Sequence, residues 1–77
     1  MEVTILAFGQ LAELTGKQSW KLQDITDITA LKQSIETSFP AISNINYLVA
    51  IDKKIIKENA PLADQATVAL LPPFSGG

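Results

Sequence analysis

The residue types with the clearest chemical potential stand at the end of the sequence, which closes on Ser75-Gly76-Gly77. Glycines carry no side chain and reach backbone conformations that are closed to other residues. A diglycine ending therefore suits a tail whose terminal carboxylate enters a narrow site in another protein. The simpler interpretation is a frayed chain end, since termini are often disordered. The residues just before the diglycine favour the first interpretation.

Histidine and cysteine are both absent from the sequence. Their absence excludes Cys/His and Ser/His catalytic arrangements and the common His/Cys zinc sites, so we expect no metal site. Any chemistry must then use carboxylates, lysines or the chain terminus. A free terminal carboxylate is ionised at neutral pH and is a poor electrophile. It needs activation, and the chain has no Gly-x-x-x-x-Gly-Lys segment to bind ATP itself. Activation would therefore come from another protein, and we expect this chain to bind no cofactor.

The tail that carries this carboxylate begins with two prolines, Pro72 and Pro73. Proline fixes φ and holds the base of a tail extended, which lowers the entropy lost when the tail threads into a partner. Fully extended, residues 72–77 would reach about 20 Å at roughly 3.3 Å per residue. The sequence therefore predicts a folded domain over residues 1–71 and an extended tail over residues 72–77.

Composition limits the partners that this domain could have. The 77 residues make one small domain, with 47% apolar and 18% charged residues and a net charge of −2. All six basic residues are lysines, and the lack of arginine argues against a nucleic-acid module. We see neither a run of about 18 apolar residues nor a secretory leader. A cysteine-free chain also fits a reducing cytoplasm. We expect a cytoplasmic protein with no nucleic-acid or membrane partner.

The first half of the chain predicts two strands and two helices. Residues 2–8 alternate as a strand, residues 10–15 read as a short helix ending at Gly16, and residues 18–22 read as an edge strand. Asp27 is the expected N-cap of the main helix, and Pro40 ends it. The main helix carries one apolar stripe, formed by Ile28, Leu31, Ile35 and Phe39.

The second half predicts strands joined by turns. Residues 41–46 read as an irregular connection, and residues 47–51 as a buried strand. After a turn at 52–54 comes a small strand at 55–56. Leu62 is expected to fill the core from a loop, and the last strand spans residues 66–71, after a turn at 63–65.

This order of elements predicts an α+β fold in which the main helix lies across one face of a mixed sheet, because that arrangement buries every apolar stripe. It is the β-grasp, or ubiquitin-like, roll. The alternative is a ferredoxin-like sandwich, but that fold needs two long crossover helices, and residues 10–15 are too few for one.

Strand alternation also predicts a docking face. If Val3, Ile5, Val68 and Leu70 face the helix, then Phe8 and Leu71 point outward, with Ile55 beside them. Large exposed apolar residues grouped near a reactive tail suggest a binding surface. The alternative is that a loop covers them. A small basic group stands near the turn after residue 51, and it is either a solvated loop or a group that steers an acidic partner: Lys53, Lys54 and Lys57.

Three patches together resemble the small subunit of molybdopterin synthase, the MoaD family of sulfur carriers. Residues 8–16 look like the family's Phe-Ala-x-x-x-Glu-x-x-Gly stretch after the first strand. Residues 59–64 are similar to the family's loop before the last strand. Residues 71–77 look like its Pro-Pro-x-x-Gly-Gly ending, which is the most specific of the three. The spacing between patches also agrees, so the resemblance covers the whole chain.

The resemblance implies a carrier cycle centred on Gly77. An E1-like (MoeB-like) enzyme would adenylate the Gly77 carboxylate with ATP, and a sulfur donor would convert it to a thiocarboxylate. The tail would then enter the large (MoaE-like) subunit of molybdopterin synthase and give its sulfur to cyclic pyranopterin monophosphate. The chain would be the sulfur-donating subunit of a heteromeric sulfurtransferase, with no catalytic side chains of its own.

By the same resemblance, docking would involve Phe8, Ile55 and Leu71, and the tail would consist of Pro72, Pro73, Phe74, Ser75 and Gly76 before the reactive Gly77. Three other functions stay open. The chain could carry sulfur for thiamine synthesis or tRNA thiolation, could modify other proteins through isopeptide bonds, or could be a plain interaction domain with an inert tail.

Overall fold

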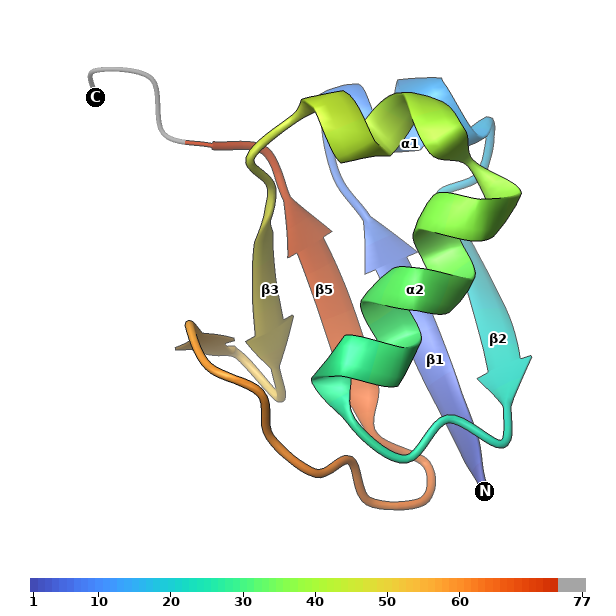
Figure 1. The fold of residues 1–77 in the computed structure, drawn as a ribbon, viewed down its shortest axis with the longest axis vertical. Helices are drawn as coiled ribbons and strands as arrows, with labels where there is room; N and C mark the ends of the chain where they lie inside the picture. The colour runs from blue at the N-terminus through green and yellow to red at the C-terminus, as the bar shows by residue number, and fades with distance from the viewer. Residues whose placement is uncertain (74–77) are drawn as a thin grey trace.

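The computed structural model describes residues 1–73; Phe74, Ser75, Gly76 and Gly77, to which the sequence assigns most of the reactive tail, lie outside the described residues. Two strand–helix pairs come first along the described part of the chain, followed by a 3-10 helix and three consecutive strands (Figure 1). Their bounds are β1 Glu2–Ala7, α1 Gln10–Thr15, β2 Ser19–Gln23, α2 Ile28–Ser38, the 3-10 helix η1 Pro40–Asn44, β3 Leu48–Ile51, β4 Lys54–Ile56 and β5 Thr67–Leu71.

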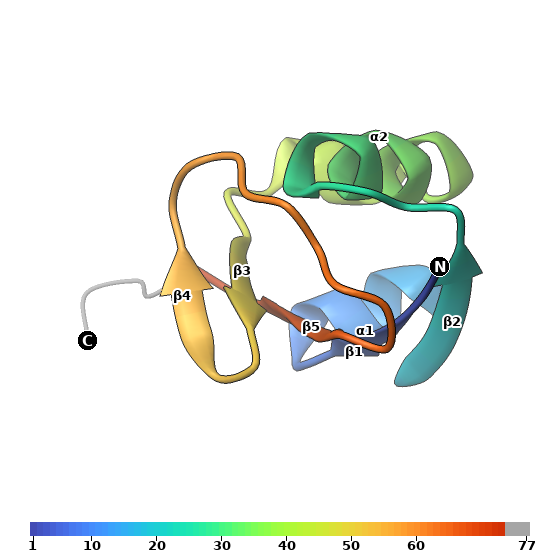
Figure 2. The ribbon, with the colours of Figure 1, turned by 90° about the horizontal axis from the view of Figure 1, so that it is seen from below.

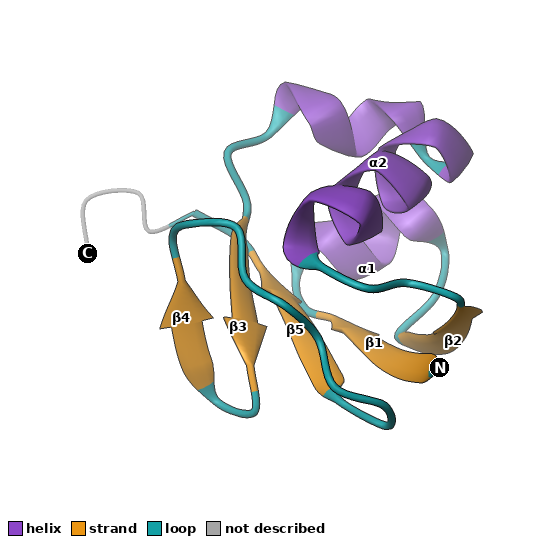
Figure 3. Ribbon diagram, turned by 60° about the horizontal axis from the view of Figure 1, so that its bottom comes forward, coloured by secondary structure: helices purple, strands orange, loops and turns teal. Residues whose placement is uncertain are grey.

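The strands form one mixed sheet in the order β2-β1-β5-β3-β4. The neighbours β1 and β5 run parallel, and the other neighbouring pairs run antiparallel. Figures 2 and 3 show α2 lying across one side of this sheet. This is the β-grasp arrangement that the sequence predicts. The ferredoxin-like alternative fails, since α1 has only six residues.

The core lies between α2 and the sheet. Alternate residues of β1 are buried, as are alternate residues of β5, and both sets meet the buried face of α2. Full burial of such a side chain contributes about 1.5–3 kcal/mol. Leu62 joins the same cluster from the loop before β5, as predicted. The side chains with no measurable exposure include Val3, Ile5, Leu11, Leu31, Ile42, Val68 and Leu70.

The start of α2 is held by two side chains. Asp27, the predicted N-cap, accepts a hydrogen bond from the Ala30 N–H at 2.8 Å. The Oδ1 atom of Asn59 accepts from the Thr29 N–H at 2.9 Å. Two of the orphan N–H groups at the helix start are therefore paired. This contact gives the segment 59–64 a structural role, because it ties the loop before β5 to the helix.

Two local features differ from the sequence prediction. Residues 40–44 form a 3-10 helix, where we expected an irregular connection. Pro40 suits a first helical position, and Ile42 fills the core with its side chain fully buried. In α1, Leu11 and Leu14 stand three residues apart, the spacing of one apolar helix face, but Leu14 is exposed and Thr15 is buried in its place; the Thr15 hydroxyl donates to the Leu11 carbonyl at 3.0 Å.

Neither α1 nor α2 has the length and apolar character of a membrane span, and this holds for every helix within residues 1–73.

Candidate docking face and tail base

The face of the sheet opposite α2 carries a row of apolar side chains. The strand register pairs Leu6 with Ala69, Ala69 with Ala50, and Ala50 with Ile55. Directly paired residues in a sheet project to the same face. The row therefore crosses β1, β5, β3 and β4 on the side away from the helix.

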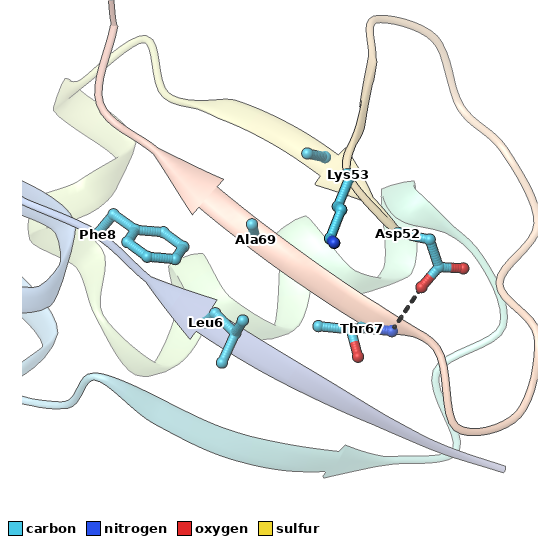
Figure 4. A pocket seen from close by; sticks show the side chains of 7 residues that line it. Leu6, Phe8, Asp52, Lys53, Thr67 and Ala69 are labelled. Carbon is cyan, nitrogen blue, oxygen red and sulfur yellow. Dashed lines mark hydrogen bonds between the residues drawn. The ribbon is translucent and has the colours of Figure 1, made fainter.

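This row contains a shallow hollow of about 420 Å³. The small side chains of Ala50 and Ala69 form its floor, because larger residues stand on either side of them. Figure 4 shows Leu6 and Phe8 on the β1 side and the Asp52-Lys53 turn on the other. Thr67 completes the lining.

The predicted docking residues occupy different positions around the hollow. Phe8 lines it and is 46% exposed, and Ile55 is equally exposed at the β4 end of the row. Leu71 is half-buried and pairs with Leu48, two pairs closer to the tail than the Ala50–Ala69 pair of the row. Sequence reasoning missed Leu6 and Ala69. Strand alternation gave a usable signal for Leu6, since it shares a face with Phe8.

The other half of the same face is polar. Glu2 lies at the start of β1, where its carboxylate accepts from Gln23 Nε2 at 2.6 Å and lies 3.6 Å from Lys21 Nζ. Thr4 pairs with Lys21 on the neighbouring strand. The apolar half is therefore the one next to the end of β5, where the tail begins.

The base of the tail is held against the loop after β1. The Phe8 N–H donates to the Leu70 carbonyl at 3.1 Å, which extends the parallel pairing past the end of β1. Gly9 follows with a φ of +55°, and a Cβ atom on it would lie 3.3 Å from Pro72 Cγ. Pro72 is half-buried and Pro73 exposed. This contact sets where the chain leaves the sheet.

The described residues offer few groups for chemistry. Within residues 1–73, no three His, Cys, Asp or Glu side chains come together as metal ligands. The pKa of Tyr47 is raised, first by burial and then by its hydrogen bond to Glu36 and the charge of that carboxylate. The Tyr47 hydroxyl donates to Glu36 Oε2 at 2.6 Å. Neither residue lines the hollow.

The sequence matches the ThiS family over residues 5–77. The chain belongs to the ThiS family. No curated protein matches it at the sequence level.

Solved structures share its fold at low sequence identity. Small archaeal modifier protein 1 from Haloferax volcanii has a TM-score of 0.83 at 20% identity, with all of both chains covered. The putative molybdopterin converting factor subunit 1 from Pyrococcus furiosus has a TM-score of 0.85 at 15% identity, with 96% of this chain and 99% of that chain covered.

A complex of subunits 1 and 2 of the molybdopterin-converting factor from Helicobacter pylori 26695 contains a chain with a TM-score of 0.74 at 24% identity, with both chains fully covered. These structures confirm the predicted β-grasp fold, which the chain shares with molybdopterin-converting factor subunit 1, while the family match places it in the ThiS family.

Proposed function

We propose that this ThiS-family chain is the sulfur-carrier subunit of molybdopterin synthase. The observation that carries the proposal is that the apolar half of the open face adjoins the base of a Pro-Pro-x-x-Gly-Gly tail. Phe8 lines the hollow, and its N–H is bonded to Leu70, two residues before Pro72. A partner that covers the hollow would therefore receive the tail from a fixed direction.

In the proposed cycle, an E1-like enzyme transfers AMP from ATP to the Gly77 carboxylate and releases pyrophosphate. A sulfur donor then displaces AMP, which leaves a thiocarboxylate at Gly77. ATP is used by the activating enzyme, and the chain binds no cofactor of its own. Because the chain has no cysteine, the cycle suits a reducing cytoplasm.

The proposed acceptor is the large subunit of molybdopterin synthase. There the thiocarboxylate gives sulfur to cyclic pyranopterin monophosphate, and two deliveries complete the dithiolene. Phe8, Ile55 and Leu71 dock on the partner, and the hollow between Leu6 and Ala69 receives one of its apolar side chains. The Helicobacter pylori complex of subunits 1 and 2 supports a partner of this kind.

A second candidate is a protein modifier, in which Gly77 forms isopeptide bonds with lysines of other proteins. The specific observation that favours it is the similarity to small archaeal modifier protein 1, both from Haloferax volcanii and from Methanosarcina acetivorans. A carrier for thiamine synthesis or tRNA thiolation is a third, since the family match does not separate these pathways.

The first experiment is intact-mass analysis after incubation with ATP, an E1-like activating enzyme and a sulfur donor. We expect one oxygen to be replaced by one sulfur at Gly77, and no change in a control chain that lacks Gly77. An unmodified wild-type chain, where a known carrier is modified, would contradict the proposal.

The second experiment separates the candidates. The thiocarboxylate form is added to the large subunit with cyclic pyranopterin monophosphate, and molybdopterin is measured. We expect molybdopterin to form. Lysine adducts on other proteins, without pterin sulfuration, would instead favour the modifier.

A further inference from the structure

The turn between β3 and β4 places a lysine where the backbone favours glycine. Its two central residues, Asp52 and Lys53, have φ values of +47° and +76°. Two-residue hairpin loops with positive φ at both positions strongly prefer Asn-Gly or Asp-Gly, because a Cβ is strained there. Lys53 thus occupies a position at which a glycine would fold more easily.

The two side chains of this turn have different surroundings. Asp52 is tied to β5, because its N–H donates to the Thr67 carbonyl at 3.1 Å and its Oδ1 accepts, at 3.5 Å, from the Thr67 N–H. Lys53 lines the hollow, and Figure 4 shows its side chain extending over the floor toward Thr67 and Ala69. Within residues 1–73, no carboxylate oxygen lies within salt-bridge distance of its ammonium group.

Lys53 is the cation among the residues that line the hollow, and it stands beside Asp52. Lys54 pairs with Ile51 and therefore lies on the other face of the sheet from Ile55, and the exposed Lys57 is followed by the exposed Glu58. The acidic residue of β1 is Glu2, which lies in the polar half of this face beside Lys21. A chain with a net charge of −2 therefore offers a cation at the edge of its apolar docking surface.

We propose that the protein partner covering the hollow places an aspartate or glutamate carboxylate against the Lys53 ammonium while an apolar side chain fills the space above Ala69. This inference rests on the proposed function and specifies the chemistry of its partner. Charge complementarity at the edge of an interface mainly raises the association rate and makes it depend on salt. Strained residues are enriched at functional sites, and a contact with a partner would give Lys53 a reason to remain in this turn.

The test compares association rates with the molybdopterin synthase large subunit at low and at physiological salt. Lys53→Asn removes the charge and keeps a residue that tolerates positive φ, whereas Lys53→Arg keeps the charge. We expect Lys53→Asn to associate about fivefold more slowly at low salt, with a smaller difference at higher salt. Lys53→Arg should stay close to the wild type.

Two controls separate docking from folding. Lys32→Gln removes one positive charge from α2, on the covered side of the sheet, and should leave the association rate unchanged. The thermal midpoint of Lys53→Asn should be at least that of the wild type, since asparagine adopts positive φ more readily than lysine does. If Lys53→Asn associates more slowly than the wild type but is just as stable, Lys53 acts in docking. A lysine with only a structural role would not give this result.

The outcomes are distinct. If the wild type binds and Lys53→Asn matches it at low salt, this inference is wrong and the proposed function stands. If the wild type does not bind the large subunit, the proposed function is wrong. The association rates of the wild type and Lys53→Asn are then compared with the E1-like activating enzyme as the partner, and equal rates there would show that the inference is wrong as well. Self-association that buries the hollow, detected by sedimentation, would also overturn it.

Discussion

Gly9 and Pro72 meet at the end of the parallel pair β1 and β5, with only 3.3 Å between Pro72 Cγ and the place where a Gly9 Cβ would stand. Parallel strands bring the residues that follow them to the same edge of the sheet. The first residue of the predicted tail therefore rests on a position that carries no side chain. Because φ at Gly9 is +55°, both the space and the backbone there favour glycine.

We predict that Gly9→Ala lowers stability more than Gly16→Ala does. Gly16 has a φ of +73° but open space around its Cβ position, so its substitution adds backbone strain alone, of about 1–2 kcal/mol. Gly9→Ala adds the contact with Pro72 as well. Urea unfolding followed by the fluorescence of the single tryptophan, Trp20, measures both.

The double variant Gly9→Ala, Pro72→Ala isolates that contact, since a smaller residue at 72 relieves the crowding. We expect part of the loss to be recovered, and the rate of sulfur transfer to recover with it. Equal losses at Gly9 and Gly16, with no recovery in the double variant, would show that the tail base does not depend on this glycine.

A second prediction concerns the exposed apolar residues. Ile55→Asp should weaken binding to the large subunit by about tenfold or more, because a charge would replace an apolar docking side chain and be buried without a partner. Leu14→Asp is the matched control. Leu14 is also a large apolar residue with an exposed side chain, 38% exposed, but it lies on α1 and not on the open face of the sheet. Calorimetric titration measures both. Comparable losses in the two variants would argue against docking through the open face.

A third prediction tests how the loop before β5 is attached to α2. Asp27→Ala and Asn59→Ala should each lower the free energy of unfolding by about 1 kcal/mol, because each leaves a helix-start N–H without its partner. Asn46→Ala, at an exposed asparagine in the connection before β3, should change it by less than about 0.5 kcal/mol. Thermal unfolding followed by circular dichroism provides the comparison. A neutral Asn59→Ala would remove the structural role given to that residue.

A fourth prediction uses the only tyrosine, so that tyrosinate absorbance reports Tyr47 alone. Burial and Glu36 raise its pKa above the ordinary value near 10. The unfolded chain therefore loses the phenolic proton first, and the folded state loses stability as the pH rises above about 10. Tyr47→Phe should reduce this loss.

In the folded wild type, tyrosinate should form at a higher pH than in the urea-unfolded chain. Glu36→Gln removes the charge and keeps an acceptor, so it should move the titration back toward the ordinary value while burial keeps it above that value. Identical titrations of the folded and unfolded chains would contradict the assignment. Lys32 Nζ, 5.7 Å from the centre of the Tyr47 ring, is the cation to vary next.

Local patterns were enough to predict most elements of the fold. The alternation of Val3 and Ile5 gave the buried face of β1, Asp27 gave the start of α2, and Gly16 gave the end of α1. Each of these signals is complete within a few residues. The 3-10 helix at residues 40–44 was missed because it is shorter than two helical turns, so no periodicity could develop.

The site was harder to predict, since it depends on register and on contacts between distant segments. The sequence identified Phe8 and Ile55 as outward-facing, but the hollow exists because Ala69 pairs with both Leu6 and Ala50 across the sheet. The contact between Gly9 and Pro72 likewise requires β1 and β5 to be parallel neighbours. No short-range pattern encodes either relationship.

The position of β5 has a consequence for how force acts on this molecule. The tail continues a strand that is bonded on both sides, to β1 and to β3. A pulling force applied through the tail acts along β5, parallel to its neighbours and perpendicular to the hydrogen bonds between them. The bonds are therefore loaded in shear and must break together. Traction applied to the edge strand β4 would open its ladder one bond at a time. An enzyme that grips and pulls the terminus therefore pulls on the central strand of the sheet.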